Sequence, residues 1–112
     1  MKRKGLSFLL VLMLGVFTVF AADKTETVKV KGGDCEECKT HIETTAIGVE
    51  GVSAAEWDAE TQKLTVTFDE ETTTLDAVEK KVAEAGNDTQ NYKASEEAYD
   101  ALPECCKYER EK

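Results

Sequence analysis

The stretch TETVKVKGGDCEECKTHIETTAI, residues 25–47, decides the fold. Its first part alternates between polar and apolar residues, with Val28 and Val30 on one face, which predicts a half-buried β-strand over 25–31. Two glycines then break the strand. From residue 36 the apolar positions recur every three or four residues, which predicts an α-helix over 36–47. The fold therefore starts with a strand that leads through a short loop into a helix.

The rest of the chain adds a hairpin, a second helix and a weaker last strand. The two strands of the hairpin are predicted over residues 52–59 and 63–69. The second helix is predicted over 75–86 and the last strand over 89–94. Thr74 is the expected N-cap of the second helix. The order β-α-β-β-α-β predicts an α+β fold of the ferredoxin-like type, a βαββαβ sandwich with a four-stranded antiparallel sheet and two helices. A short C-terminal tail follows, with one or two helical turns expected before Pro103.

Residues 1–22 have the features of a secretory signal peptide. Basic residues at positions 2–4 precede an apolar run over 6–20, and small residues permit cleavage after Ala21 or Ala22. The run is shorter than the about 20 apolar residues that a membrane-spanning helix needs. We therefore predict a periplasmic or secreted protein whose mature chain does not span a membrane. The predicted divisions are the signal peptide (1–22), one domain (23–94) and the C-terminal tail (95–112).

Charge and composition exclude several classes of function. The chain has 112 residues, 14 Lys and Arg against 23 Asp and Glu, and a formal charge of −9, which becomes −12 once the three basic residues of the signal peptide are removed. Nucleic acid is not an expected partner, because phosphate contacts need a clustered basic surface. A single histidine and no recognisable catalytic constellation predict that the protein is not an enzyme. The four cysteines are then the main functional lead.

Cys35 and Cys38 form a C-x-x-C pair at the point where the first strand leads into the first helix. Unpaired N–H groups at a helix N-terminus favour thiolates over thiols. Three uses of the pair stay open: binding of a soft metal ion, thiol–disulfide exchange, and a structural disulfide. The flanks lack the aromatic and proline residues typical of thioredoxin-like pairs, since Pro103 is the only proline. A structural disulfide in so small a ring would restrain the unfolded chain little.

Several motifs fit one known family: GGDCEEC at 32–38, Ile42, Gly51-Val52, Val66 in the hairpin, and Ala85-Gly86 at the end of the second helix. Together they resemble the heavy-metal-associated domain of copper chaperones, metal-transporting P-type ATPases and periplasmic mercury-binding proteins, over about residues 25–94. The resemblance implies that Cys35 and Cys38 are thiolate ligands of a soft metal ion, Cu(I) first and Hg(II) as the alternative. It also implies a carrier that passes the ion by ligand exchange to a metal-transporting membrane protein or another thiol-bearing carrier.

Two positions depart from the pattern of that family. Gly33 stands where the family usually has Met, an apolar plug beneath the metal loop, and Asn87 stands where an aromatic residue often follows the glycine. Both positions lie near the expected loop, so the preferred ion stays open. Loss of the Met is expected to leave the loop looser.

A second pair, Cys105-Cys106, lies in the tail, outside the pattern of the family. In the predicted topology Ser95 emerges at the end of the domain opposite the metal loop, and the way back is roughly 20–25 Å, which ten residues with a short helix can just span. If the tail returns, three or four sulfurs surround the ion, a set that suits Zn²⁺, Cd²⁺ or a Cu(I) cluster. On the same geometry, direct disulfides between the two pairs are also possible. If the tail does not return, the pair is a separate weak site or an oxidised or intermolecular thiol pair.

The sequence as a whole predicts an extracytoplasmic soft-metal-ion binding protein of the copper or mercury type. Its candidate metal ligands are Cys35, Cys38, Cys105 and Cys106. His41, on the next turn of the first helix, is expected to be a solvent-exposed residue and not a ligand, while Tyr99 and Tyr108 are expected to pack against the core. Two other functions stay open: a thiol–disulfide exchange protein that uses the C-x-x-C pair, and an interaction domain stapled by disulfides.

Overall fold

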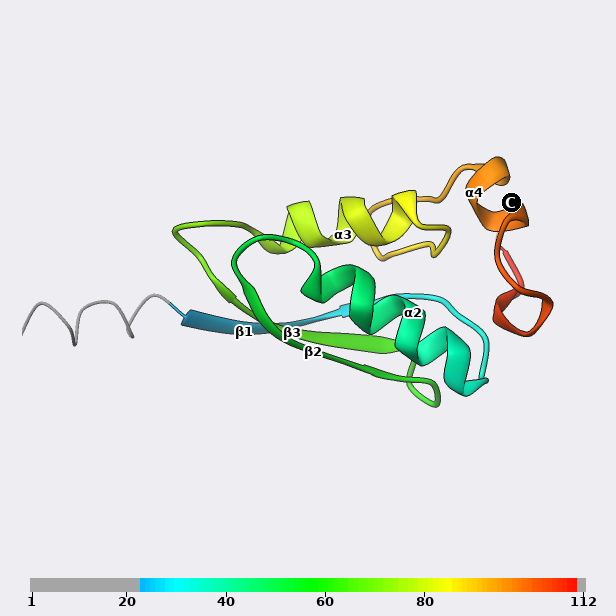
Figure 1. Ribbon diagram of the computed structural model, residues 1–112, viewed down its shortest axis with the longest axis horizontal. Coiled ribbons are helices and arrows are strands. Elements are labelled where there is room, and N and C mark those ends of the chain that lie inside the picture. Colours follow the sequence, from blue (N-terminus) through cyan, green and yellow to red (C-terminus); the bar gives the residue numbers. More distant parts are fainter. Residues whose placement is uncertain (1–22, 111–112) are drawn as a thin grey trace, which may run out of the picture.

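The computed structural model describes residues 23–110, and Figure 1 shows how their elements are arranged. In chain order these are β1 (Asp23–Lys29), α2 (Glu36–Ile47), β2 (Val52–Asp58), β3 (Lys63–Asp69), α3 (Leu75–Glu84), α4 (Glu96–Asp100) and a 3-10 turn, η1 (Glu104–Cys106). The α+β class is confirmed, and α2 and β3 have the predicted bounds. The predicted signal peptide lies outside the described residues.

Within the described part of the chain, three strands form one antiparallel sheet in the order β1-β3-β2. β3 lies in the middle, and its alternation places Leu64, Val66 and Phe68 on the buried face. Leu64 pairs with Val28 of β1 on one side and with Trp57 of β2 on the other, so the three buried side chains lie in one row across the sheet.

Helices α2 and α3 cover one face of this sheet (Figure 1). Their apolar stripes close the core, with Ile42 of α2 and Val78 and Val82 of α3 fully buried. Thr74 is the N-cap of α3 as predicted, since its hydroxyl accepts a hydrogen bond from the N–H of Ala77 at 3.1 Å. The hydrophobic core therefore lies between one sheet and two helices, as the element order indicates.

The prediction of a fourth strand over 89–94 is wrong. This segment makes a single bridge to the end of β1, between Val30 and Thr89. The chain then turns, because Thr89 N–H donates to the carbonyl of Tyr92 at 2.7 Å and the Thr89 hydroxyl donates to the buried carboxylate of Glu79 at 2.9 Å. Such local side-chain and turn hydrogen bonds compete with pairing along a strand edge.

The chain consequently leaves the domain at the same end as the cysteine loop, and the predicted emergence of Ser95 at the opposite end is also wrong. Ala94 N–H donates to the carboxylate of Asp88 at 2.8 Å, and the carbonyl of Asp88 accepts from Lys31 N–H at 2.8 Å, just beyond β1. The tail forms α4, which is the expected short helix, and then η1, which contacts α2. Figure 1 shows both elements at this end of the molecule.

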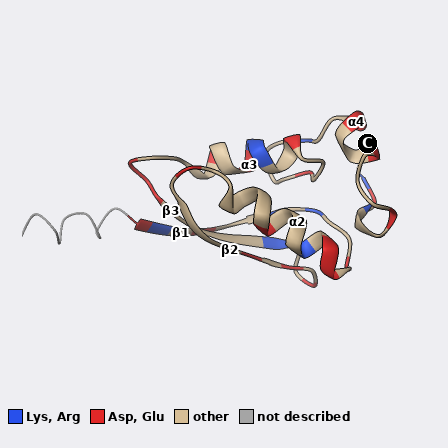
Figure 2. Ribbon diagram, in the orientation of Figure 1, with Lys and Arg blue, Asp and Glu red and all other residues tan. Residues whose placement is uncertain are grey.

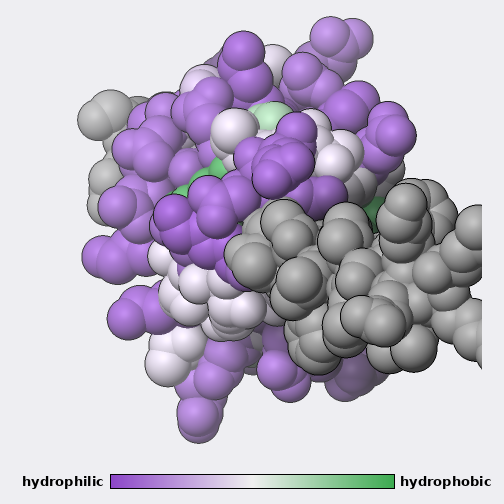
Figure 3. All heavy atoms as spheres, turned by 90° about the vertical axis from the view of Figure 1, so that its left-hand side faces the viewer, coloured by the Kyte–Doolittle hydropathy of each residue, from purple (hydrophilic) through white to green (hydrophobic). Residues whose placement is uncertain are grey.

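The face at the other end of the molecule is mostly hydrophilic (Figure 3). Among residues 23–110 the large hydrophobic side chain that stays exposed is Ile47, at 49%. No helix in the same range is long and apolar enough to cross a membrane.

Candidate metal site

The C-x-x-C pair lies where the loop after β1 enters α2. Cys35 is the N-cap residue of α2, and its carbonyl accepts the N–H of Cys38 at 3.1 Å. Residues three apart lie on the same side of a helix start, and the two Sγ atoms are 2.7 Å apart. Cys38 is fully buried, whereas Cys35 is only partly buried. Cys38 is therefore the buried member of the pair, and Cys35 is the more accessible one.

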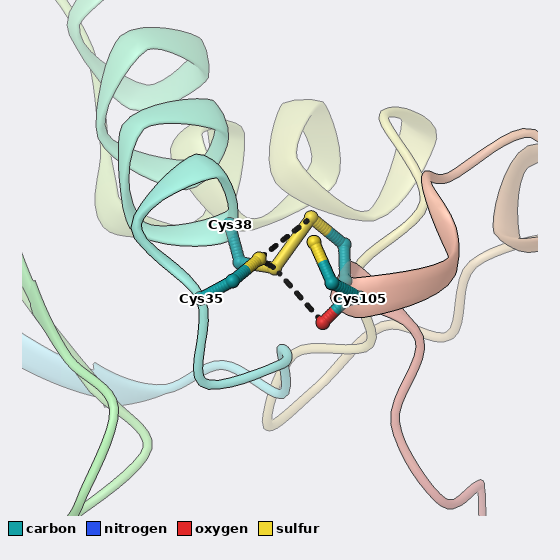
Figure 4. A group of neighbouring side chains, drawn as sticks. Cys35, Cys38 and Cys105 are labelled. Carbon is teal, nitrogen blue, oxygen red and sulfur yellow. Dashed lines mark hydrogen bonds between the residues drawn. A yellow bond between two sulfur atoms is a disulfide. The ribbon is translucent and has the colours of Figure 1, made fainter.

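The tail brings the second cysteine pair to the same place. Cys106 is 1% exposed and packs with Cys38 and Leu102, while its Sγ atom lies 3.7 Å from Sγ of Cys35. The carbonyl of Cys105 lies 3.4 Å from Sγ of Cys38. Figure 4 shows the start of α2 and η1 facing each other across these sulfurs. All four Sγ atoms lie within 4.8 Å of one another, so the return of the tail, which the sequence left open, is the arrangement in the structure.

One disulfide, Cys38–Cys106, joins the two pairs across a sequence separation of 68 residues, and Cys35 and Cys105 are free thiols. The bond runs between the pairs and not within either pair, which is one of the alternatives that the sequence left open. The interaction of Cys105 with the Cys35 side chain, followed by burial and the charge of Glu37, raises the pKa of the Cys105 thiol to about 11.

The tail is fastened to the domain by a group of side chains that we call the tail clasp: Asp88, Tyr99, Tyr108 and Arg110. The guanidinium of Arg110 donates to the two carboxylate oxygens of Asp88 at 2.8 and 3.1 Å and to the carbonyl of Ala94 at 2.6 Å. Such bidentate charged hydrogen bonds are among the stronger ones in proteins. Arg110 also lies over the ring of Tyr99, 4.9 Å from its centroid.

Tyr108 connects the clasp to the segment that follows α3. Its hydroxyl accepts from the N–H of Asp88 at 2.7 Å and donates to the carbonyl of Gly86 at 2.8 Å. The hydroxyl of Tyr99 donates to the Tyr108 carbonyl at 2.6 Å, and the two rings meet edge to face with centroids 5.0 Å apart. As expected, both tyrosines pack against a core, namely the small cluster of Cys38, Leu102 and Cys106. Their hydroxyl groups also hold the tail.

The environment of the clasp shifts two ionisations. Burial opposes ionisation of Asp88, but the hydrogen bonds from Arg110 and from Ala94 N–H outweigh burial and lower the pKa of this carboxyl. Burial disfavours the phenolate of Tyr108 and raises its pKa to about 12. At neutral pH the clasp therefore keeps a charged Asp88–Arg110 pair and a neutral Tyr108.

Gly33, where a looser loop was expected, is covered by the tail. A Cβ atom at Gly33 would overlap the carbonyl oxygen of Cys105 and lie 2.9 Å from Cα of Cys106. Only a residue without a side chain allows the tail backbone to approach this closely. Asn87 is fully buried and donates from Nδ2 to the carbonyl of Lys31 at 2.8 Å, so it holds the start of the loop.

The remaining polar groups lie around the cluster and not in it. His41 is partly buried rather than exposed, and its Nε2 atom lies 3.1 Å from the carbonyl of Ala85, between α2 and α3. Glu36 and Glu37 form the acidic first turn of α2, which Figure 2 shows beside the tail. The carboxylate of Glu37 accepts from the thiol of Cys105 at 3.9 Å. This acidic rim favours a cation or a basic surface near the thiols.

Asp88 and Arg110 are functional candidates that the sequence does not indicate. They are 22 residues apart and lie in segments without regular structure, so neither periodicity nor a motif links them. Gly33 gave a signal, because it departs from the pattern of the family, but the sequence could not show what fills the space.

Comparison with known proteins places this arrangement in context. Residues 27–88 match the profile of the heavy-metal-associated domain. The chain is 37% identical over 71 residues to the mercuric transport protein periplasmic component of Pseudomonas aeruginosa, which covers 63% of the chain and 78% of the relative. It is 33% identical over 64 residues to the copper chaperone CopZ of Staphylococcus saprophyticus, which covers 57% of the chain and 94% of the relative.

Among solved structures, oxidised MerP from Ralstonia metallidurans superposes with a TM-score of 0.58 at 33% identity, covering 62% of the chain and 96% of that protein. The matched profile ends at residue 88, before the second cysteine pair.

Proposed function

Because the chain belongs to the heavy-metal-associated domain family, we propose that it is an extracytoplasmic carrier of a soft metal ion, Cu(I) or Hg(II). In this proposal the thiolates of Cys35 and Cys38 hold the ion and pass it on by ligand exchange. The observation that carries the proposal is the 2.7 Å separation of the two Sγ atoms at the start of α2. Paired thiolates select soft cations over Mg²⁺ or Ca²⁺. The protein catalyses no covalent reaction in this role.

The location and the receiving partner belong to the same proposal. The signal-peptide features of residues 1–22 and the periplasmic relatives support export, to the periplasm or beyond. The acidic first turn of α2 beside the thiols supports docking of a partner with a basic surface, either a metal-transporting membrane protein or a second thiol-bearing carrier. N-terminal sequencing of the exported protein tests the location, and cleavage after Ala21 or Ala22 is expected.

Metal titration of the reduced protein, without the signal peptide, tests the carrier function. We expect one Cu(I) or Hg(II) ion to bind per chain in competition with a chelator. Cys35→Ser is expected to weaken binding by more than about 100-fold, because even loss of a group that only supports a ligand costs about 10–100-fold. Thr40→Ala, an exposed position on α2, is the matched control. Equal affinity of the Cys35→Ser variant and the parent protein would contradict the proposal.

One observation favours a second candidate function, thiol–disulfide exchange. The free thiol of Cys35 lies 3.7 Å from Sγ of Cys106, which is part of the disulfide with Cys38. A thiolate this close to a disulfide is positioned for exchange. Catalysed reduction of insulin by a thiol reductant, lost in Cys35→Ser, would support this candidate. If insulin is reduced no faster than by the reductant alone, this candidate is excluded and metal transfer remains the proposed function.

A further inference from the structure

The geometry points to a closed four-thiolate metal site, in which the tail supplies Cys105 and Cys106 to the loop that carries Cys35 and Cys38. The inference rests on the proposed function of Cys35 and Cys38 and extends the cargo of that site. Besides Cu(I) or Hg(II), which two thiolates can hold, the complete site would take a divalent ion with a filled d shell that prefers tetrahedral sulfur, such as Zn²⁺ or Cd²⁺. The inference also assigns the tail a role that nothing in the matched domain provides, since the profile ends at residue 88.

The spacing of the sulfurs carries the first step. Four thiolates at about 2.3 Å from a tetrahedral ion lie about 3.8 Å from one another. The four Sγ atoms lie within 4.8 Å of one another, and those of Cys35 and Cys106 are 3.7 Å apart. Sγ of Cys38 is closer to its neighbours, 2.7 Å from Sγ of Cys35 and bonded to Cys106, and it has to move away from both once the disulfide is reduced. Two sulfurs suffice for a linear ion such as Cu(I), whereas a compact set of four matches a tetrahedral one.

The fit between the tail and the loop carries the second step. The backbone of Cys105 lies directly over Gly33, where any side chain would overlap it. Cys38 is fully buried and packs with Leu102 and Cys106 of the tail. A tail that did not pack on the loop would leave room for a side chain at residue 33, whereas the docked tail requires glycine there. The docked tail therefore behaves as the second half of the site.

The tail clasp carries the third step, because it positions the second pair without using a sulfur. Arg110 and Tyr108 lie beyond the cysteines in the sequence and attach to Asp88 and Gly86, next to the end of α3. Clasp residues thus flank the vicinal pair in the sequence, with Tyr99 of α4 before it and Tyr108 and Arg110 after it. In this respect the clasp residues are positioning residues, and they do not bind the ion.

The metal-binding form is the reduced one. A thiol reductant, itself oxidised to a disulfide, supplies the two electrons that break the Cys38–Cys106 bond and leave a thiol on each residue. Binding of a divalent ion to the four sulfurs then releases their protons to solvent. The tail is therefore held over the loop in both forms, by the disulfide in the oxidised form and by the bound ion in the metal-bound form.

X-ray absorption spectroscopy on the reduced, Cd²⁺-loaded protein tests the inference, with native mass spectrometry to establish one chain per ion. We expect four sulfur neighbours in the parent protein. Two sulfurs are expected in the double variant Cys105→Ser/Cys106→Ser, with affinity lower by more than about 100-fold. Four sulfurs from two chains sharing one ion, or two sulfurs in the parent protein, would overturn the inference.

Arg110→Ala separates positioning from coordination, because it removes no sulfur. We expect its Cd²⁺ affinity to fall by about 10–100-fold, as for the loss of other supporting groups, and Glu109→Ala, an exposed neighbour, is the matched control with unchanged affinity. An unchanged affinity in Arg110→Ala would remove the clasp from the inference.

The two levels of proposal fail in different ways. If the double tail variant binds Cd²⁺ as tightly as the parent protein while Cys35→Ser does not, the four-thiolate site is refuted and the carrier function stands. If neither change affects Cd²⁺ binding and Cys35→Ser also binds Cu(I) and Hg(II) as tightly as the parent protein, the carrier function is refuted as well.

Discussion

The two cysteine pairs reach the same point in space by different physical means. Cys35 and Cys38 are close because three residues make about one turn at the start of a helix, a local rule that any chain with this motif obeys. Cys105 and Cys106 are close to them only because Gly33 leaves room and the tail clasp holds the chain beyond. The first pair is therefore set by local geometry, and the second depends on tertiary contacts that can be removed one at a time.

The largest expected effect breaks the covalent link between the pairs. In oxidised protein, Cys106→Ser removes a disulfide that closes a separation of 68 residues, and we expect the free energy of unfolding to fall by about 4 kcal/mol. Chemical denaturation followed by circular dichroism measures the change. Cys105→Ser, which removes an exposed free thiol, is the control and is expected to change stability little. A similar loss in both variants would show that the pairing differs in solution.

The next effect tests the close approach over the loop. Gly33→Ala places a Cβ atom against the backbone of the tail, and overpacking of this kind typically costs about 1–3 kcal/mol. We expect faster hydrogen exchange in residues 95–110 with little change in α2 and α3. Gly48→Ala is the control, because its Cβ atom would make only ordinary contacts at 3.4 Å. Equal exchange in the tail of both variants would mean that the tail does not lie on Gly33.

The clasp makes a prediction about alkaline pH. The raised pKa of Tyr108, about 12 in the folded protein, against an ordinary value of 10.0, means that the unfolded or undocked state loses its proton first. The stability of the docked tail is therefore full below pH 10 and falls as pH rises through 12. The tyrosinate absorbance of the parent protein minus that of Tyr108→Phe should show this late titration. A difference spectrum that titrates near pH 10 would indicate an undocked tail.

The smallest effect separates the domain from the tail. Thr74→Ala and Ser95→Ala each remove an N-cap hydrogen bond, in α3 and α4, at 3.1 Å in both cases. We expect Thr74→Ala to lower the global stability by about 1 kcal/mol, because α3 contributes to the main core. Ser95→Ala should affect only local hydrogen exchange in the tail. If both variants lower the global midpoint equally, the tail and the domain unfold as one unit.

The sequence predicted well the features that depend on local pattern. The strand that ends before the loop, the helix Glu36–Ile47, the hairpin and the N-cap Thr74 follow from periodicity and capping chemistry, and the structure contains them. The position of the C-x-x-C pair at a helix start is likewise predicted from local pattern. The order of the elements follows from the same patterns, and the resemblance to the family agrees with it.

The sequence did not predict the features that depend on contacts between residues distant in the chain. Residues 89–94 contain a plausible strand pattern, but the buried carboxylate of Glu79 and the turn at Thr89 outweigh pairing with β1. Because residues 89–94 turn instead of forming a strand, the tail starts at the end of the domain that carries the cysteine loop. The predicted path of roughly 20–25 Å from the opposite end is therefore not needed. Asp88 and Arg110 could not be linked at all, because an ion pair 22 residues apart has no sequence signature.

The separation between the two pairs also bears on when the protein acquires its binding site during synthesis. The domain needs nothing beyond residue 94 to complete its sheet and its two main helices. The sulfurs of Cys105 and Cys106 can join those of Cys35 and Cys38 only after the chain has been made beyond residue 106. A chain that ended before residue 105 would thus present an open two-sulfur loop, and the set of four sulfurs would require the tail.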